Sequence, residues 1–240
     1  MAWKRWYSNN RISYVLALSL VMVLGILGIA PTARATPVRN KIWNGYVTKT
    51  GKRTKIIASW HVPTLKCGTA LSNASQWIGL AGVNAPLVQI GIESICSTGI
   101  QYDYAFYQVV PKQSSGKKII GLVTPGDLID ASVKYLGGHK YRVHLMENAW
   151  SWDFTKKVTQ PDLGTAPKTA EWIVEAGSGT PLSKFGRVHF ENAFFNNRSL
   201  TNRNARIFIA DTGSGSKTRV TKISQYGGHG PNFSVKWLRS

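Results

Sequence analysis

The chain has 240 residues, 43% of them hydrophobic, and it contains nine Trp, nine Tyr and eight Phe. This composition excludes a disordered chain and suffices for one large domain with a sizeable core. The formal charge of +19 favours contact with anionic surfaces such as cell-wall polymers, phospholipid headgroups or nucleic acid. The cations are scattered, however, and no motif of the common nucleic-acid-binding modules occurs, so we expect no nucleic acid as a partner.

Residues 1–35 have the pattern of a signal peptide. Three basic residues precede the apolar run 14–30, and an Ala-Arg-Ala sequence ends at Ala35, so cleavage would begin the mature chain at Thr36. The run is long for a signal peptide and slightly short for a membrane span, which leaves an uncleaved anchor open. In both cases we expect a secreted, monomeric domain over residues 37–240, with a charge of +15 and no membrane contact apart from such an anchor.

After residue 36 no segment shows a sustained helical period. Short runs that alternate or are wholly apolar predict strands, and the segments between them are rich in Gly, Pro, Asn and Ser. The predicted strands cover residues 55–62, 75–80, 87–92, 102–110, 128–135, 141–147, 171–176, 187–190, 205–210 and 234–238. This number and spacing of strands predicts an all-β fold, either a sandwich or a closed barrel.

The chain has two cysteines, Cys67 and Cys96. In an exported protein such a pair forms a disulfide more often than two free thiols, so we predict a bridge that holds loops beside Gln89. No further ligands with suitable spacing accompany the pair, so we predict no metal site and no cofactor.

Two predicted strands carry polar residues on one face only. In 87–93, Val88, Ile90 and Ile92 share an apolar face, whereas Gln89 and Glu93 flank a glycine on the other face. A glycine inside a strand often marks the close approach of another backbone, which suits a groove that admits a peptide.

The segment 171–175 shows a similar division, with Glu171, Ile173 and Glu175 on one face. These are two of only eleven acidic residues in the chain. Taken alone, the pattern is more typical of acids that face solvent or pair with a cation than of a catalytic site.

A series of short motifs resembles the eqolisins, the glutamic peptidases. The matching segments are Asn-Lys-Ile-Trp-Asn-Gly at 40–45, Val-Pro at 62–63, Trp-Ile-Gly-Leu at 77–80, Leu-Val-Gln-Ile-Gly at 87–91, Tyr-Ala-Phe-Tyr at 104–107, Pro-Gly-Asp at 125–127, Glu-Asn at 147–148, Ala-Glu-Trp-Ile-Val-Glu at 170–175 and Phe-Gly at 185–186. Each motif is weak alone, but their order and spacing over about 170 residues make the resemblance specific.

The resemblance implies a sandwich of two long antiparallel sheets, lectin-like in architecture, with a substrate groove on one sheet. It also implies an endopeptidase that works at acid pH through a Gln–Glu dyad, which falls on Gln89 and Glu175. The residues expected to bind the polypeptide substrate are Trp43, Trp77, Glu93, Tyr107, Gln108 and Glu171.

The residue types suit the chemistry. A carboxylate at position 175 can take a proton from the attacking water and later pass it to the leaving amine. The Gln89 amide can hold that water through its oxygen and stabilise the oxyanion through its nitrogen, and it does not titrate.

Three positions depart from the family pattern. Gln108 stands where Glu is frequent, Ala81 where an Asp follows the Trp-x-Gly motif, and Glu93 where the family has Asp. The loss of two acids near the dyad is expected to lower the pKa of Glu175.

The main alternative is a lectin-like module that binds sugar or peptide without cleaving it. Trp43, Trp77, Tyr104, Phe106 and Trp172 would serve as binding platforms or as core residues equally well. Other catalytic sets are disfavoured, because no Gly-x-Ser-x-Gly turn and no His spacing typical of zinc sites occurs.

Overall fold

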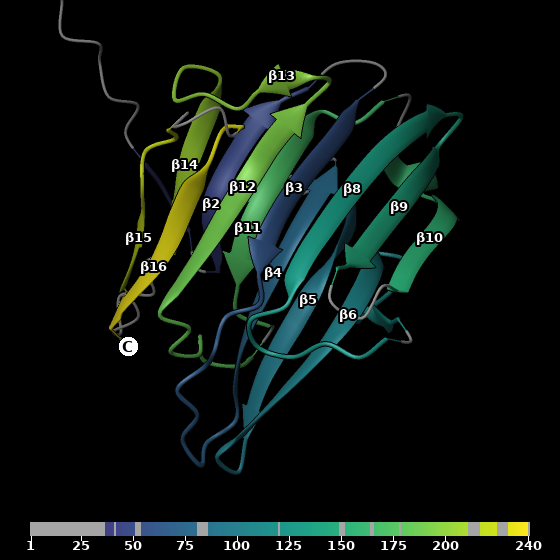
Figure 1. The fold of residues 1–240 in the computed structure, drawn as a ribbon. Helices are drawn as coiled ribbons and strands as arrows, with labels where there is room; N and C mark the ends of the chain where they lie inside the picture. The colour runs from purple at the N-terminus through teal and green to yellow at the C-terminus, as the bar shows by residue number, and fades with distance from the viewer. Residues whose placement is uncertain are drawn as a thin grey trace, which may run out of the picture. The chain divides into compact units, whose positions relative to one another are not determined.

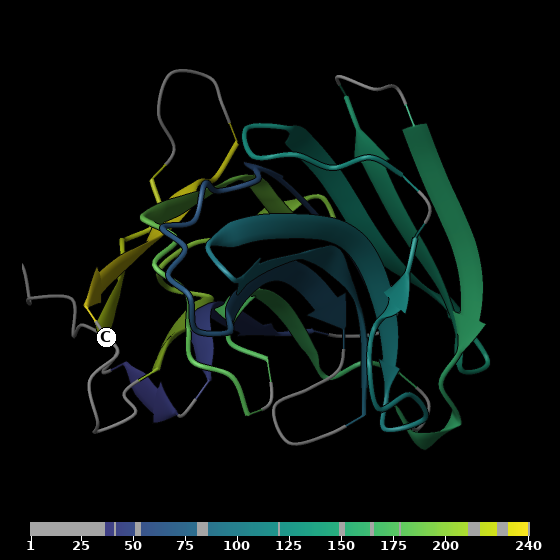
Figure 2. The same cartoon turned by 90° about the horizontal axis from the view of Figure 1, so that it is seen from below.

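The protein folds into two eight-stranded β-layers that pack face to face, as the computed structural model shows (Figure 1; from below, Figure 2). The described residues are 37–40, 42–50, 54–80, 86–119, 121–148, 152–163, 166–177, 179–210, 217–224 and 230–239, all within the compact unit Ala35–Ser240. The expected signal segment 1–35 and Ala81 lie outside them. Within these ranges no helix is long and apolar enough to cross a membrane.

The first sheet holds the long central strands. Its order is β1 (Val38–Asn40), β14 (Ala205–Ala210), β2 (Trp43–Lys49), β11 (Thr169–Glu175), β4 (Ser72–Leu80), β5 (Leu87–Ser97), β6 (Ile100–Val110) and β7 (Lys117–Lys118). All neighbours are antiparallel except β1 and β14.

The second sheet is antiparallel throughout. Its order is β10 (Trp152–Thr159), β9 (Lys140–Glu147), β8 (Leu128–Gly137), β3 (Lys55–His61), β12 (Arg187–Phe195), β16 (Phe233–Arg239) and β15 (Lys217–Val220), with the short β13 (Arg198–Ser199) beside β12. The described helical structure is the 3-10 turn η1 (Pro161–Leu163). The predicted all-β sandwich is thus confirmed.

The core lies between the sheets. Trp60, Phe190 and Phe233 of the second sheet are buried against Tyr46 and Trp172 of the first. Two of these rings are hydrogen-bonded through their buried polar atoms: the Trp172 indole donates to the Ile57 carbonyl at 3.0 Å, and the Tyr46 hydroxyl donates to the Thr221 carbonyl at 3.0 Å. This contact fixes β11 against β3, so the face of β11 that carries its acids must point away from the second sheet.

The strands β5 and β6 form one long hairpin. Thr98 and Gly99 both have positive φ, 52° and 84°, as a two-residue turn between antiparallel strands requires. This turn fixes the register in which Gln89 pairs with Gln108 and Glu93 with Tyr104. The turn therefore sets which side chains meet on the outer face.

Candidate active site

A cavity of about 800 Å³ opens on the outer face of the first sheet, away from the second sheet. Strand alternation produces it, because Val88 and Ile90 of β5 point into the core while Gln89 and Glu93 point outward. Its lining includes both members of the expected dyad and is contributed mainly by β2, β4, β5, β6 and β11. The lining residues are Ile42, Trp43, Leu71, Asn73, Ser75, Trp77, Pro86, Leu87, Gln89, Glu93, Ile95, Phe106, Gln108, Val110, Pro111, Ser114, Ser115, Gly116, Glu175, Gly177 and Thr180.

The absence of a side chain at Gly91 lets β4 and β5 approach closely at the floor of this groove. A Cβ there would lie 2.0 Å from the Gln76 carbonyl oxygen and 2.7 Å from the Trp77 Cα. The close approach expected at this glycine is therefore present, and it is made by the neighbouring strand. The Trp77 ring lies over the floor and is 1% exposed.

Gln89 has a fixed amide orientation. Its Nε2 donates to Gln108 Oε1 at 2.7 Å, and Gln108 Nε2 donates to the Gln113 carbonyl at 3.2 Å. Gln113 itself is held to β6, since it accepts from the Val109 amide at 2.9 Å through its Oε1. A backbone carbonyl can only accept, so neither amide can flip without placing two oxygens together.

The other end of the Gln89 amide has no partner. Its Oε1 is buried and makes no hydrogen bond to the described residues. A buried acceptor left unpaired costs roughly 1–3 kcal/mol, so a water or substrate N–H that reached it would stabilise the site.

Glu175 ends β11 at the rim of the cavity and is held by two indoles. The Trp77 Nε1 donates to its Oε2 at 2.8 Å, and the Trp43 indole also donates to this carboxyl. The two rings meet edge to face with centroids 5.3 Å apart. Trp43 and Trp77 therefore both line the groove and both position the acid.

Burial is the main influence on Glu175 and raises its pKa to about 7, while the bonds from Trp77 and Trp43 lower it and the charge of Glu93 raises it. The expected decrease considered only the neighbouring acids. Gln108 carries no charge, and Ala81 lies outside the described residues. The loss of water around the carboxyl raises the pKa of Glu175, so the expected decrease is wrong.

Glu93 lies across Ser75 from Glu175 in the strand register. Its Oε1 accepts from Asn73 Nδ2 at 3.0 Å, and its Oε2 accepts from the Tyr104 hydroxyl. It is half-buried and lines the cavity, so it can meet a substrate as well as act on Glu175 through its charge.

Glu171 shares the outer face of β11 but does not line the cavity. It is 0% exposed, its Oε1 accepts from the Thr169 hydroxyl at 2.8 Å, and its Oε2 has no partner among the described residues. Burial raises its pKa to about 8. The strand register sets it opposite Gln89 with only Gly79 between them.

Like Glu171, Tyr107 is an expected substrate-binding residue that does not line the groove. Its ring points into the core, where it stacks on Phe154 of β10 with centroids 5.8 Å apart. Tyr107 and Gln108 are consecutive in β6, so they face opposite sides of the sheet. Only Gln108 reaches the cavity.

A family model of the peptidase A4 family matches residues 41–230. The chain belongs to the peptidase A4 family, the eqolisins. No curated protein sequence matches it significantly. Among solved structures it is similar to scytalido-glutamic peptidase with a transition-state analogue inhibitor, at 17% identity and a TM-score of 0.67, covering 83% of this chain and 99% of that one. It is also similar to SCP-B, an eqolisin in complex with the tripeptide Ala-Ile-His, at 17% identity, a TM-score of 0.64 and the same coverage.

As a member of this family, the protein is a glutamic-type endopeptidase with polypeptide substrates. The lectin-like module without catalysis is therefore set aside, although the sandwich architecture that suggested it is present. In the described segments, no group of His, Cys, Asp or Glu side chains is arranged to hold a metal ion.

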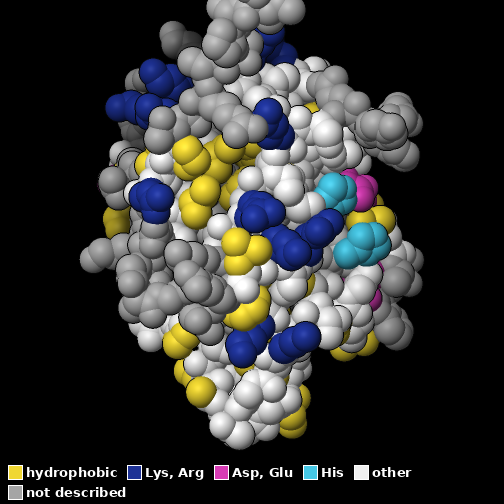
Figure 3. Space-filling model, turned by 90° about the vertical axis from the view of Figure 1, so that its left-hand side faces the viewer, with side chains coloured by type: hydrophobic (Ala, Val, Ile, Leu, Met, Phe, Trp, Pro, Cys, Tyr) yellow, Lys and Arg dark blue, Asp and Glu magenta, His cyan; other side chains and the backbone are white. Residues whose placement is uncertain are grey.

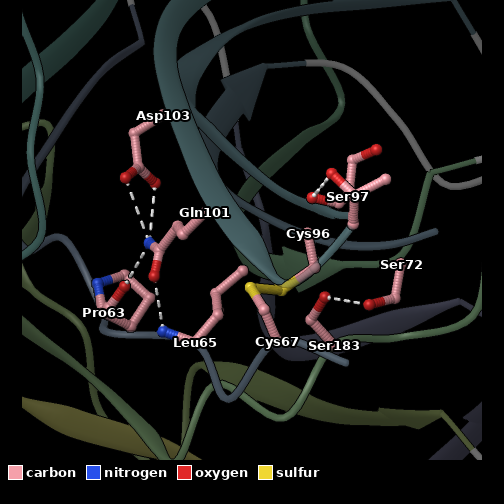
Figure 4. The surroundings of a disulfide bond; sticks show 10 residues. Pro63, Leu65, Cys67, Ser72, Cys96, Ser97, Gln101, Asp103 and Ser183 are labelled. Atoms are coloured by element: carbon pink, nitrogen blue, oxygen red, sulfur yellow. Dashed lines mark hydrogen bonds between the residues drawn. A yellow bond between two sulfur atoms is a disulfide. The ribbon is translucent and has the colours of Figure 1, made fainter. Parts of the chain in front are cut away.

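The disulfide of this eqolisin joins Cys67 to Cys96, as predicted (Figure 4). Its place differs from the expectation, because Cys96 is seven residues from Gln89 along β5, roughly 23 Å away. The bridge instead holds the loop before β4, which Gln101 also anchors through bonds to the Pro63 carbonyl and the Leu65 amide.

Asn73 is the main site residue that the sequence did not indicate. It is 4% exposed, and its Oδ1 accepts from the Gly177 amide at 2.6 Å and the Thr180 hydroxyl at 2.8 Å. It thus fixes the loop that follows Glu175. The strand predicted over 75–80 began too late to include it, although alternation from Trp77 would have put it on the groove face.

Proposed function

We propose that this eqolisin is a secreted endopeptidase in which Glu175 and Gln89 hydrolyse the bonds of an extended polypeptide. The observation that carries the proposal is that both side chains line one cavity on one sheet face, with Trp77 between them in the strand register. The disulfide supports export to an oxidising compartment.

In the proposed reaction, ionised Glu175 takes a proton from a water, and the hydroxide attacks the peptide carbonyl carbon. The Gln89 oxygen is two strands and four residues away from Glu175 in the register, so it accepts from a second water that is hydrogen-bonded to the first, which relieves its unpaired state. The second hydrogen on Gln89 Nε2, which Gln108 leaves free, stabilises the oxyanion. Protonated Glu175 then gives its proton to the leaving nitrogen as the C–N bond breaks, and the carboxylate is restored.

Glu171 is the competing partner for Gln89, since it lies opposite across Gly79. Two observations favour Glu175. Glu175 lines the cavity, where a substrate can reach it, whereas Glu171 is wholly buried. Glu175 also receives two indole donors, which stabilise the ionised form that a base requires.

The test is cleavage of a denatured protein and of a quenched peptide between pH 3 and 9, with Glu175→Gln and Glu171→Gln as a matched pair. We expect Glu175→Gln to lose activity by roughly 100- to 10,000-fold and Glu171→Gln to keep most of it. For the free wild-type enzyme, kcat/KM should rise about tenfold per pH unit below 7 and level off above it. If activity survived Glu175→Gln but not Glu171→Gln, Glu171 would be the general base instead.

A further inference from the structure

A second hollow, of about 430 Å³, lies on the outer face of the second sheet, which is the face of the sandwich opposite the groove. The strands β3, β8, β9 and β12 contribute its lining. The lining residues are Lys55, Ile57, Ala58, Ser59, Asp130, Ala131, Ser132, His144, Asn192 and Phe194. None of these residues takes part in the peptidase site.

An irregularity in β12 shapes this hollow. The register between β12 and β3 shifts between Glu191 and Phe194, and Asn192 has a positive φ of 52°. A bulge of this kind redirects side chains and is frequent beside functional sites. Here it sets the Asn192 amide and the Phe194 ring on the wall of the hollow.

The wall of the hollow offers hydrogen-bonding groups of several kinds. The Ser132 hydroxyl and the Asn192 amide have no hydrogen-bond partner among the described residues. Asp130 is oriented by the Ser59 hydroxyl and by Asn148 Nδ2 at 2.9 Å, and His144 Nε2 lies 3.1 Å from Asp153 Oδ1. Hydroxyl, amide, imidazole and carboxylate groups around one ring suit a polyhydroxylated ligand.

A row of four cations runs across the sheet from the edge of the hollow. Lys55 pairs with Lys134, Lys134 with Arg142, and Arg142 with Lys157, on four adjacent strands about 4.8 Å apart. All four are exposed, and the ion pairs between described residues involve none of them. Like charges directly opposite one another destabilise a sheet, so an anionic partner would stabilise the protein by offsetting the repulsion between these cations.

We propose that the hollow and this row bind an acidic polysaccharide, with sugar hydroxyls in the hollow and carboxylates of successive residues along the cations. Single-stranded nucleic acid is disfavoured, because Phe194 is the single aromatic ring in the lining and base stacking uses a series of rings. A membrane surface is disfavoured as well, because none of the exposed large apolar side chains lines the hollow.

A second cationic row provides the matched control. Arg187 pairs with Lys236 and Lys236 with Arg219 on the outer face of the same sheet, away from the residues that line the hollow. Figure 3 shows Lys and Arg side chains gathered on the side of the molecule that carries β15 and β16. A ligand that needs only positive charge would use both rows.

The test measures binding of a short oligogalacturonate to the full chain by calorimetry, at two salt concentrations. Lys134→Glu/Arg142→Glu should weaken binding by roughly tenfold or more and reduce its salt dependence. Arg187→Glu/Lys236→Glu, with the same charge change, should alter the affinity by less than about twofold. Ser132→Leu, which fills the hollow and changes no charge, should also weaken binding, and all variants should keep the wild-type rate on a soluble peptide.

Several results would overturn the proposal. An equal loss of affinity in the two double variants would mean that binding depends on net charge alone. Binding of a DNA duplex or of phosphatidylglycerol vesicles as tight as that of oligogalacturonate would remove the selectivity for sugar. If the Ser132→Leu variant had a wild-type melting temperature and bound normally, the hollow would have no role.

Discussion

The substitution Gln108→Glu tests the chain of amide hydrogen bonds that orients Gln89. In the native enzyme Gln108 Nε2 faces the Gln113 carbonyl, and its Oε1 accepts from Gln89. A protonated carboxyl preserves both contacts, because its O–H donates to the carbonyl while its C=O accepts from Gln89. An ionised carboxylate has no hydrogen to donate, so one of its oxygens would face the Gln113 carbonyl oxygen and be repelled by it. The side chain would then move, and its hydrogen bond to Gln89 would be lost.

The magnitude follows from the cost of that unpaired contact. Leaving a partly buried acceptor unsatisfied costs about 1–3 kcal/mol. Since 1.36 kcal/mol corresponds to one pKa unit, the pKa of the new carboxyl should rise from about 4.3 to roughly 5–6.5. At a pH above the pKa of the new carboxyl, the cost of about 1–3 kcal/mol should lower kcat/KM by roughly 5- to 150-fold.

The assay is the ratio of variant to wild-type kcat/KM as a function of pH, because the ratio cancels the titration of Glu175. We expect the ratio to be near one at pH 4 and to fall through the range of the new carboxyl. Gln108→Met is the control, since it removes both hydrogen bonds without adding a titrating group and should lower activity equally at every pH. A ratio for Gln108→Glu that did not change with pH would refute the role given to Gln113.

Three further predictions concern the surroundings of the dyad. Trp77→Phe removes a donor that stabilises ionised Glu175, so the pKa of Glu175 should rise and the acidic limb of kcat/KM should move up by roughly one pH unit. Asn73→Ala leaves the loop after β11 without its buried anchor and should cost about 2 kcal/mol, which lowers Tm by roughly 4–8 °C in thermal denaturation. Glu171 has a folded-state pKa of about 8, so its stabilising contribution is full below about pH 4.5 and is lost as the pH rises through 8. Glu171→Gln should therefore leave Tm unchanged at pH 4 and raise it by roughly 5 °C or more at pH 8, and equal shifts at the two pH values would contradict this.

The strands with one apolar face could be predicted from the sequence, because alternation is a direct consequence of burial on one side. All ten predicted runs coincide with strands in the structure. The strand β2 was missed because Asn44 to Thr48 are buried on both faces and show no alternation. The edge strand β10 was missed for the opposite reason, since most of its residues are exposed.

The site was less accessible to such reasoning. Alternation placed Gln89 and Glu175 on the outer faces of their strands, but only the family resemblance connected two strands that are not neighbours. The resemblance identified positions rather than faces, and so it included Tyr107, which alternation with Gln108 would have excluded. The contact from Gln108 to the Gln113 carbonyl depends on the path of the turn after β6, which no periodic pattern specifies.

The pKa of Glu175 and the amide at position 108 have a common consequence. With a pKa of about 7, only about one Glu175 in a thousand is ionised at pH 4, so a base mechanism becomes efficient only near neutrality. A carboxyl at position 108 would already be ionised there and would repel the Gln113 carbonyl. In the proposed mechanism, the neutral amide keeps Gln89 oriented at the pH where Glu175 is ionised. The departure at Gln108, which first indicated only one acid fewer, therefore argues for a peptidase that works closer to neutral pH than the acid range implied by the resemblance.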